Sequence, residues 1–352
     1  MTNFIDEAWS EALPTLMDYI AVPARSPMFD PEWEASGHLA RAAALLHDWA
    51  SHRSIDGMSV ELVAAEGLTP VLFIEIPATK PDLADRAVLV YGHMDKQPEM
   101  EPWSDGLGPW QPVLRGDRLY GRGGADDGYS VFAALIAIES IQREGGDHGR
   151  LVILVEASEE SSSVHLAEHL EHLLPRIGTA ELVVALDSFC ESYDRLWTTT
   201  STRGVCGAVL DIDVCADDPH SGRASGVLPS SFRVLRELLD RIENVHTGEV
   251  LLRSANVDIP DHRVDEARVA ADSFPRLSTS FRPVPTVQPM AHDALGELLN
   301  ESWRPALEVI GIDGIPHVAD AGNVFRSRLS VKLSLRLPPT ANVSAVADEL
   351  RS

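Results

Sequence analysis

Two kinds of hydrophobic pattern alternate along the first half of the chain. Short, near-continuous apolar runs occur at residues 71–76 (VLFIEI), 87–91 (AVLVY), 151–155 (LVILV) and 181–186 (ELVVAL). Such runs are typical of strands in a sheet covered on both faces. Apolar residues at helical spacing predict helices at residues 3–22, 31–52 and 130–142. We therefore expect an α/β domain over residues 1–198, with a mixed, mostly parallel sheet and helices on both faces.

The pattern changes after about residue 200. Residues 204–214 and 328–337 alternate apolar and polar side chains, which predicts strands with one face in water. Residues 230–242 and 342–350 read as amphipathic helices. We expect a second, smaller α+β domain over residues 199–352, of the ferredoxin-like type.

Charge and composition narrow the possible partners. The chain has 54 acidic and 29 basic residues among 352, a net charge of −25. Such a surface disfavours nucleic acid and anionic membranes, which bind lysine and arginine clusters. We see no apolar run of about 18 residues and no signal-peptide pattern, and the three cysteines fit reduced thiols. The sequence thus predicts a cytoplasmic protein.

Polar residues end three of the apolar runs. His93 and Asp95 follow the second run, Glu159 and Glu160 the third, and Asp187 the fourth, while Asp126 lies in the turn GRGGADDG. Ligand sites of open α/β sheets lie at the carboxyl ends of the strands, so these side chains should meet there. Without a cation, clustered carboxylates would repel one another and resist burial. Imidazole with several carboxylates is a ligand set suited to zinc.

The same segments carry a family resemblance. The stretch from VLVYGHMDKQP to GRGGADDG, followed by SEE (158–160) and LDS (186–188), resembles the metal motifs of one zinc metallopeptidase family. That family contains carnosine dipeptidases, glutamate carboxypeptidases and aminoacylases. DPHSG (218–222), GIDG (311–314) and SLRLPP (334–339) are similar to lid segments of its carnosine dipeptidase and cytosolic non-specific dipeptidase branch. The resemblance spans nearly the whole chain.

The resemblance implies two Zn²⁺ ions, with Mn²⁺ or Co²⁺ as substitutes. His93 and Asp187 would bind one ion and Glu160 the other. Asp126 would bridge both. The implied reaction is hydrolysis of an amide bond in dipeptides or small peptides by a water held between the metals.

Four further roles follow from the same resemblance. Asp95 would orient His93, and Glu159 would act as general base. Residues 199–352 would form a lid through which two copies dimerise. His220 would reach the partner's active site, and Arg336 would face the substrate carboxylate.

Two departures from the family leave alternatives open. The turn reads Asp127-Gly128-Tyr129 where the family usually continues Asp-Lys-Gly, and no residue matches the family's final histidine ligand. We therefore expect the returning C-terminal catalytic segment to be absent from these residues. An N-acyl amino acid deacylase, an incomplete fragment or a non-catalytic dimerising relative stay possible. HLAEH (165–169) also fits an inverted zinc-protease motif.

Overall fold

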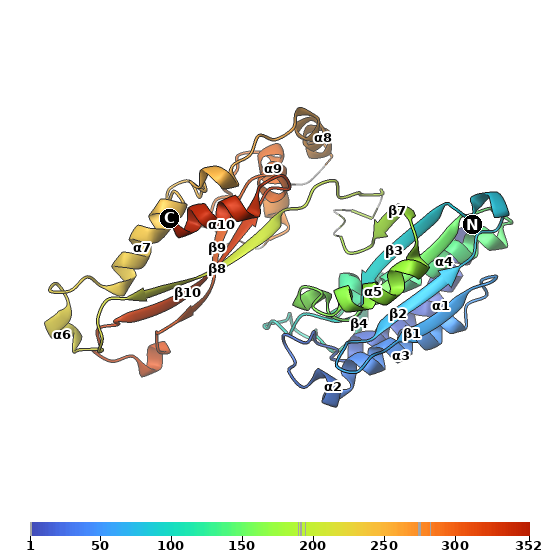
Figure 1. Cartoon of the computed structure of the whole chain (residues 1–352), viewed down its shortest axis with the longest axis horizontal. Coiled ribbons are helices and arrows are strands. Elements are labelled where there is room, and N and C mark those ends of the chain that lie inside the picture. Colours follow the sequence, from blue (N-terminus) through green and yellow to red (C-terminus); the bar gives the residue numbers. More distant parts are fainter. Residues whose placement is uncertain (1, 189, 191, 194, 274–275, 282) are drawn as a thin grey trace. The chain divides into compact units, whose positions relative to one another are not determined.

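The fold is described from a computed structural model, which covers residues 2–188, 190, 192–193, 195–273, 276–281 and 283–352. The chain forms two compact units, Met1–Phe189 and Cys190–Ser352. The sequence placed the boundary between residues 198 and 199. Each unit has its own sheet (Figure 1).

Unit 1 is built on a five-stranded mixed sheet in the order β1-β2-β6-β3-β7. The strands are β1 (Ser59–Val63), β2 (Val71–Ile76), β3 (Ala87–His93), β6 (Arg150–Glu156) and β7 (Ala180–Ala185). Strand β2 pairs antiparallel with both neighbours, and β3 pairs parallel with both β6 and β7. Four strands therefore run one way and β2 runs against them, which confirms the mixed, mostly parallel sheet.

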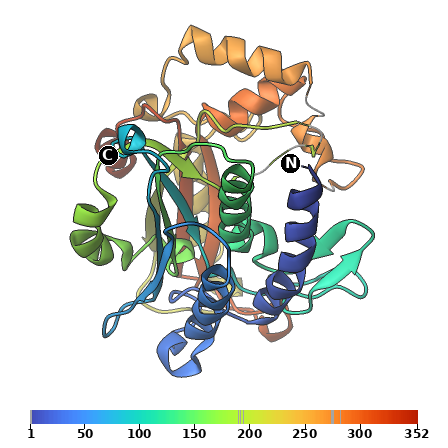
Figure 2. The ribbon, with the colours of Figure 1, turned by 90° about the vertical axis from the view of Figure 1, so that its right-hand side faces the viewer.

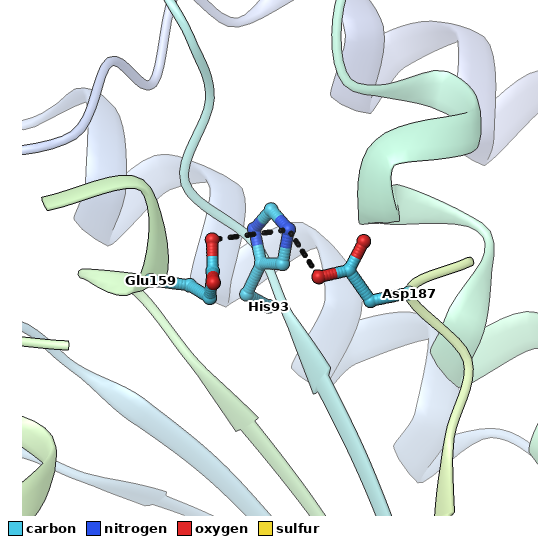
Figure 3. Close-up of side chains that lie close together, drawn as sticks. All are labelled: His93, Glu159 and Asp187. Atoms are coloured by element: carbon cyan, nitrogen blue, oxygen red, sulfur yellow. Dashed lines mark ion pairs between the residues drawn. The ribbon is translucent and has the colours of Figure 1, made fainter. Parts of the chain in front are cut away.

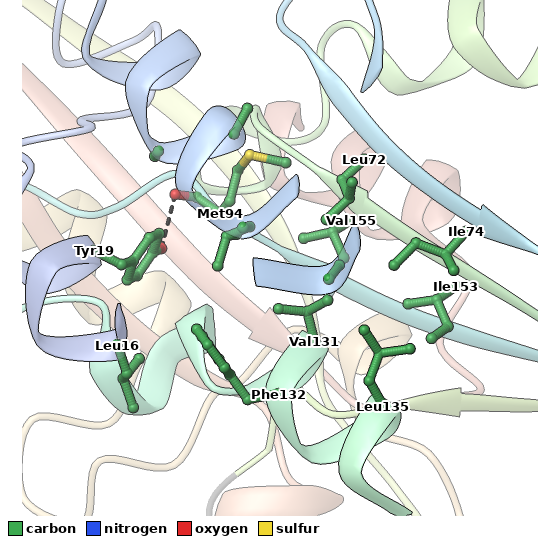
Figure 4. Close-up of a cluster of buried hydrophobic side chains, with 14 of the residues drawn as sticks. Leu16, Tyr19, Leu72, Ile74, Met94, Val131, Phe132, Leu135, Ile153 and Val155 are labelled. Atoms are coloured by element: carbon green, nitrogen blue, oxygen red, sulfur yellow. Dashed lines mark hydrogen bonds between the residues drawn. The ribbon is translucent and has the colours of Figure 1, made fainter. Parts of the chain in front are cut away.

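Helices cover both faces of this sheet. On one face lie α1 (Thr2–Ala21), α3 (His38–Ser51) and α4 (Ser130–Arg143), and α5 (Leu166–Ile177) lies on the other. Figure 2 shows the dark-blue α1 beside the green α4. The core under these helices joins apolar side chains of α1, α4 and the strands, including Leu16, Phe132, Leu135, Ile74 and Ile153 (Figure 4).

Two expectations for unit 1 were wrong in detail. The helix predicted over 31–52 is two helices, α2 (Trp33–Ser36) and α3, because Gly37 takes a left-handed conformation at φ 66° and ends the first. The apolar run at 181–186 is not buried on both faces. It forms β7 at the sheet edge, where Leu182 and Val183 are 55% and 58% exposed.

Unit 2 has a three-stranded antiparallel sheet in the order β8-β10-β9. Its strands are β8 (Gly204–Asp213), β9 (Ala306–Asp313) and β10 (Arg328–Leu337). Apolar side chains of β10 alternate inward and pack with α7 (Ser231–Ile242) and α10 (Val343–Arg351). This is an α+β unit, with three strands in the described part of its sheet.

The remaining elements are short or peripheral. They are the hairpin β4 (Val113–Arg115) and β5 (Arg118–Tyr120), the helices α6 (Ser221–Ala224), α8 (Asp261–Ala271) and α9 (Ala294–Ser302), and the single turns Pro81–Leu83, Gly124–Gly128, Glu159–Ser161, Arg253–Ala255, Leu277–Thr279 and Val318–Asp320.

Candidate active site

The carboxyl ends of β6, β3 and β7, together with the turn Gly124–Gly128, bring three predicted site residues of unit 1 around the imidazole of His93. His93 ends β3, between the turn that follows β6 and the segment that follows β7 (Figure 3). Its Nε2 lies 3.1 Å from Asp126 Oδ1, 3.8 Å from Asp187 Oδ2 and 4.0 Å from Glu159 Oε2. Parallel pairing explains the convergence, since each neighbouring strand ends at the same edge.

Two sets of potential ligand atoms share this imidazole. One joins His93 with Glu159 and Asp187, and the other joins His93 with Asp126 and Glu160. Within each set the atoms lie within 4.8 Å of one another. Oxygen and imidazole nitrogen donors at this density suit one divalent cation in each set.

Burial and mutual repulsion disfavour the ionised carboxylates of the site when no cation is bound. Burial raises the pKa of Glu160 to about 7, and burial also raises the pKa values of Glu159 and Asp187. Burial alone would lower the pKa of His93, but hydrogen bonds to Asp126 and Asp95 outweigh it and raise that pKa to about 12. The hydrogen bond from His93 in turn lowers the pKa of Asp126. A divalent cation at these carboxylates would offset the repulsion and the burial that raise their pKa values.

Buried oxygen atoms without partners support the same assignment. Glu160 Oε1 and Asp127 Oδ1 are buried and have no hydrogen-bond partner among the described residues. A buried anionic oxygen left unpaired is costly, and a metal ion would satisfy it. The residues present therefore fit a metal centre.

Asp95 connects two parts of the site. Its side chain is fully buried, and its two carboxylate oxygens accept hydrogen bonds from the main-chain N–H groups of Glu159 and Glu160, at 3.1 and 3.0 Å. His93 Nδ1 lies 3.0 Å from the main-chain oxygen of Asp95 and 3.5 Å from its carboxylate. Asp95 therefore orients the glutamate turn as well as the histidine.

Three residues of the site escaped the sequence reasoning. Asp127 is fully buried, accepts a hydrogen bond from the main-chain N–H of His93 at 3.1 Å, and has a pKa that burial raises to about 7. Gln97 donates to Glu160 Oε2. Tyr129 donates from its hydroxyl to the carbonyl of Leu186, beside Asp187. Their positions next to proposed ligands were the available signal.

The glycine-rich turn explains why the chain lacks a lysine after Asp127. A Cβ atom at Gly128 would lie 2.1 Å from the Tyr19 ring and 2.5 Å from the carbonyl oxygen of Gly123. The end of α1 therefore fills the space that a side chain would need.

The HLAEH segment supplies no metal group among the described residues. His169 Nε2 is 2.8 Å from the carbonyl oxygen of Thr69. His165 Nδ1 accepts from the N–H of Thr69 at 3.2 Å. Both imidazoles instead bind the main chain of the loop before β2.

The structure does not bring His220 and Arg336 together. His220 follows β8, is exposed, and accepts a hydrogen bond at Nδ1 from the N–H of Gly222. Arg336 lies on the exposed side of β10, opposite Val205 at the start of β8. The two side chains thus stand toward opposite ends of one sheet.

Comparison with known proteins decides the family. The profile described as peptidase family M20/M25/M40 matches residues 89–347. This chain belongs to that family. The M20 chain is 26% identical to the human Beta-Ala-His dipeptidase over 358 residues, 99% of this chain and 69% of the relative. It is 26% identical to the cysteinylglycine-S-conjugate dipeptidase of Corynebacterium striatum over 266 residues, 75% of this chain and 56% of the relative.

The fold agrees with the family. The crystal structure of human carnosine dipeptidase 1 superposes with a TM-score of 0.74 at 24% identity, covering 99% of this chain and 74% of that one. The M20 chain is therefore a peptidase-type hydrolase of α/β fold that uses a divalent metal. None of the helices that the structure describes is both long and apolar enough to cross a membrane.

Proposed function

We propose that this M20 chain is a zinc dipeptidase. The observation that carries the proposal is the convergence of His93 with carboxylates that follow β6 and β7 and with Asp126 of the glycine-rich turn. His93 and Asp187 would hold one Zn²⁺ and Glu160 the other, with Asp126 shared between them. Mn²⁺ or Co²⁺ could replace zinc, because the same oxygen and nitrogen donors suit them. When bound, the two ions supply Lewis-acid charge that acidifies water and polarises the scissile carbonyl.

Glu159 is the base in this proposal. Its carboxylate reaches the site, 4.0 Å from His93 Nε2, while its main-chain N–H is fixed by Asp95. Burial raises the pKa of Glu159 toward neutral pH. A group whose pKa lies near the working pH both accepts and returns a proton efficiently. Glu159 would take the proton of the attacking water at a carboxylate oxygen and deliver it to the leaving amine.

In this proposal His220 and Arg336 of unit 2 contact the substrate, and the two residues at one site come from different copies of the chain. Strand β10 runs from the level of Arg328, paired with Asp213, to that of Arg336, paired with Val205. At about 3.3 Å per residue the eight steps between them span roughly 26 Å, and His220 lies beyond the Asp213 end. An extended dipeptide spans only about 7 Å. One copy therefore cannot offer both side chains to one dipeptide, and a homodimer through unit 2 would supply them.

Zinc titration followed by a substrate panel tests this function. A protein that contains residues 1–352 should bind two Zn²⁺ per copy and release amino acids from dipeptides. N-acyl amino acids belong in the same panel, because a deacylase would cleave them in preference. A chain that binds no zinc and cleaves neither class would overturn the proposal.

A further inference from the structure

A buried lysine stands next to the proposed metal site. Lys96 is fully buried, and its Nζ donates to the carbonyl oxygens of Tyr19 at 2.7 Å, Val22 at 2.8 Å and Ile20 at 3.4 Å. The same ammonium lies 4.0 Å from the centre of the Tyr19 ring. Its three acceptors are main-chain oxygens, so the N–H groups of Lys96 are directed at the end of α1, while burial lowers the pKa of this side chain to about 7.

Lys96 completes the end of that helix. The last carbonyls of a helix lack internal partners and carry the negative end of its dipole. Helix α1 has no basic residue in its own last turn. Tyr19 returns the contact by donating from its hydroxyl to the carbonyl of Met94 at 2.8 Å (Figure 4). Reciprocal hydrogen bonds therefore fasten α1 to residues 93–96, which include His93 and Asp95.

The lysine stem also shapes the turn that carries Asp126. A Cβ atom at Gly123 would lie 2.6–2.7 Å from the Cε, Cδ and Cγ atoms of Lys96. Gly123 has a φ of 79°, a conformation that side chains disfavour. The turn is thus in contact with Lys96 just before the metal-binding aspartate.

We propose that Lys96 is a positioning residue for the metal centre. By holding residues 93–96 on the end of α1 and supporting the turn at Gly123, it sets the place of Asp126 relative to His93. Its ammonium touches neither substrate nor metal. The proposal rests on the proposed function, because it assigns Lys96 a part in spacing the two zinc ions.

Lys96→Met tests the ammonium while keeping an unbranched stem of similar length. Loss of a group that orients metal ligands typically weakens metal binding about 10–100-fold, and we expect that loss here. Hydrogen exchange in the metal-free protein should speed up in residues 121–128, with exchange in unit 2 unchanged. EPR of the Mn²⁺-loaded protein should show altered coupling between the two ions. Lys80→Met, which changes an exposed lysine paired with Asp147, is the matched control.

Gly123→Ala approaches the same contact from the turn. Its control is Gly116→Ala, where φ is 65° and nothing lies within 4 Å of the added Cβ, so both changes carry a similar backbone cost. Gly123→Ala should weaken zinc binding, and Gly116→Ala should not. The double variant Lys96→Ala/Gly123→Ala should lose less zinc affinity than the sum of the losses in the two single variants, because both changes remove the same contact.

Several results would overturn this role. One is a folded Lys96→Met protein whose zinc affinity and hydrogen-exchange rates equal those of the wild type. Another is a Gly123→Ala protein that binds zinc as tightly as the Gly116→Ala protein does. Should Lys96→Met not fold, the glycine pair decides alone. If the unaltered chain binds no zinc, the proposed function fails. Unchanged exchange at 121–128 in Lys96→Met would then refute the positioning role, and faster exchange would support it.

Discussion

The two units bury very different side chains around their sheets. In unit 1, His93, Asp95 and Lys96 are fully buried at the end of β3, and Asp127 is fully buried in the turn before α4. In unit 2, the buried face of β10 is apolar throughout, and its charged residues Arg328, Lys332 and Arg336 lie on the exposed face. Unit 2 thus follows the alternation expected of a half-buried sheet.

The difference shows where chemistry and where stability reside. Buried charge is costly unless it is paired, hydrogen-bonded or neutralised by a metal. Unit 1 tolerates it through hydrogen bonds such as those from Glu159 and Glu160 to Asp95. The buried polar groups of unit 1 therefore form its candidate active site. In unit 2 the buried face of the sheet is apolar and contributes to stability.

The largest expected effect is on turnover. Glu159→Gln should lower kcat about 10²–10⁴-fold, because the proposed base is lost, and should leave both zinc ions bound. Kinetics and metal analysis on one preparation measure this. Glu171→Gln, an exposed change on α5, is the control. Near-normal kcat in Glu159→Gln would require another base.

Core truncation should separate the stabilities of the units. Leu333 is 3% exposed in the core of unit 2 and Ile153 is 1% exposed in that of unit 1. Changing either to alanine should cost about 2–5 kcal/mol of unfolding free energy. Hydrogen exchange should show that Leu333→Ala loosens unit 2 while zinc affinity in unit 1 stays unchanged. Equal loosening of both units would show that they unfold together.

Arg336→Met should lower kcat/KM by about 10–150-fold through loss of charge-assisted hydrogen bonds to the substrate carboxylate. Arg328→Met removes an arginine from the same exposed face, where it pairs with Asp213, and should have little effect. Kinetics with a dipeptide and with its C-terminal amide give the comparison. A similar loss for both substrates would argue against carboxylate binding by Arg336.

Mixing two proteins with impaired activity tests the dimer proposal. If His220 and Arg336 of one site come from different copies, Arg336→Met and His220→Ala chains should recover part of the activity when refolded together. One site of each mixed dimer would then have both residues intact. No recovery in a verified mixed dimer would place both residues in the same copy.

The smallest expected effect is the pH dependence of stability. Burial raises the pKa values of Asp127 and Glu160 to about 7, above the ordinary values of 3.8 and 4.5 for these side chains. The metal-free native state therefore holds extra protons between those values, and its unfolding free energy falls as pH rises through this window. Above pH 7, His93, with a pKa raised to about 12 from 6.5, acts in the same direction, whereas Lys96, whose pKa burial lowers to about 7, acts in the opposite direction.

Zinc should reverse this trend, because its ligands must be deprotonated. The increase in Tm on adding zinc should be larger at pH 8 than at pH 5.5, as measured by calorimetry with and without a chelator. Equal increases at both pH values would show that these groups do not take part in metal binding.

Much of unit 1 could be predicted because its signals are local. The apolar runs at 71–76 and 151–155 became β2 and β6, and the helical spacing at 130–142 became α4. In unit 2, strand β9 was missed, because the adjacent apolar residues Val309 and Ile310 break the alternation expected of a half-buried strand. The exposure of Leu182 could not be predicted either, since composition does not tell an edge strand from a central one.

The sequence by itself determined the residues that gather at the site. Three of the apolar runs are followed by site residues, namely His93, the Glu159–Glu160 pair and Asp187. The carboxyl ends of parallel strands lie at the same edge of a sheet, so these residues come together there. Only the tertiary structure decided which groups support them. The contacts of Lys96 with Tyr19, and of Asp95 with the 159–160 turn, join segments more than 60 positions apart in sequence. Such contacts depend on chain packing in three dimensions, which no local pattern of residues records.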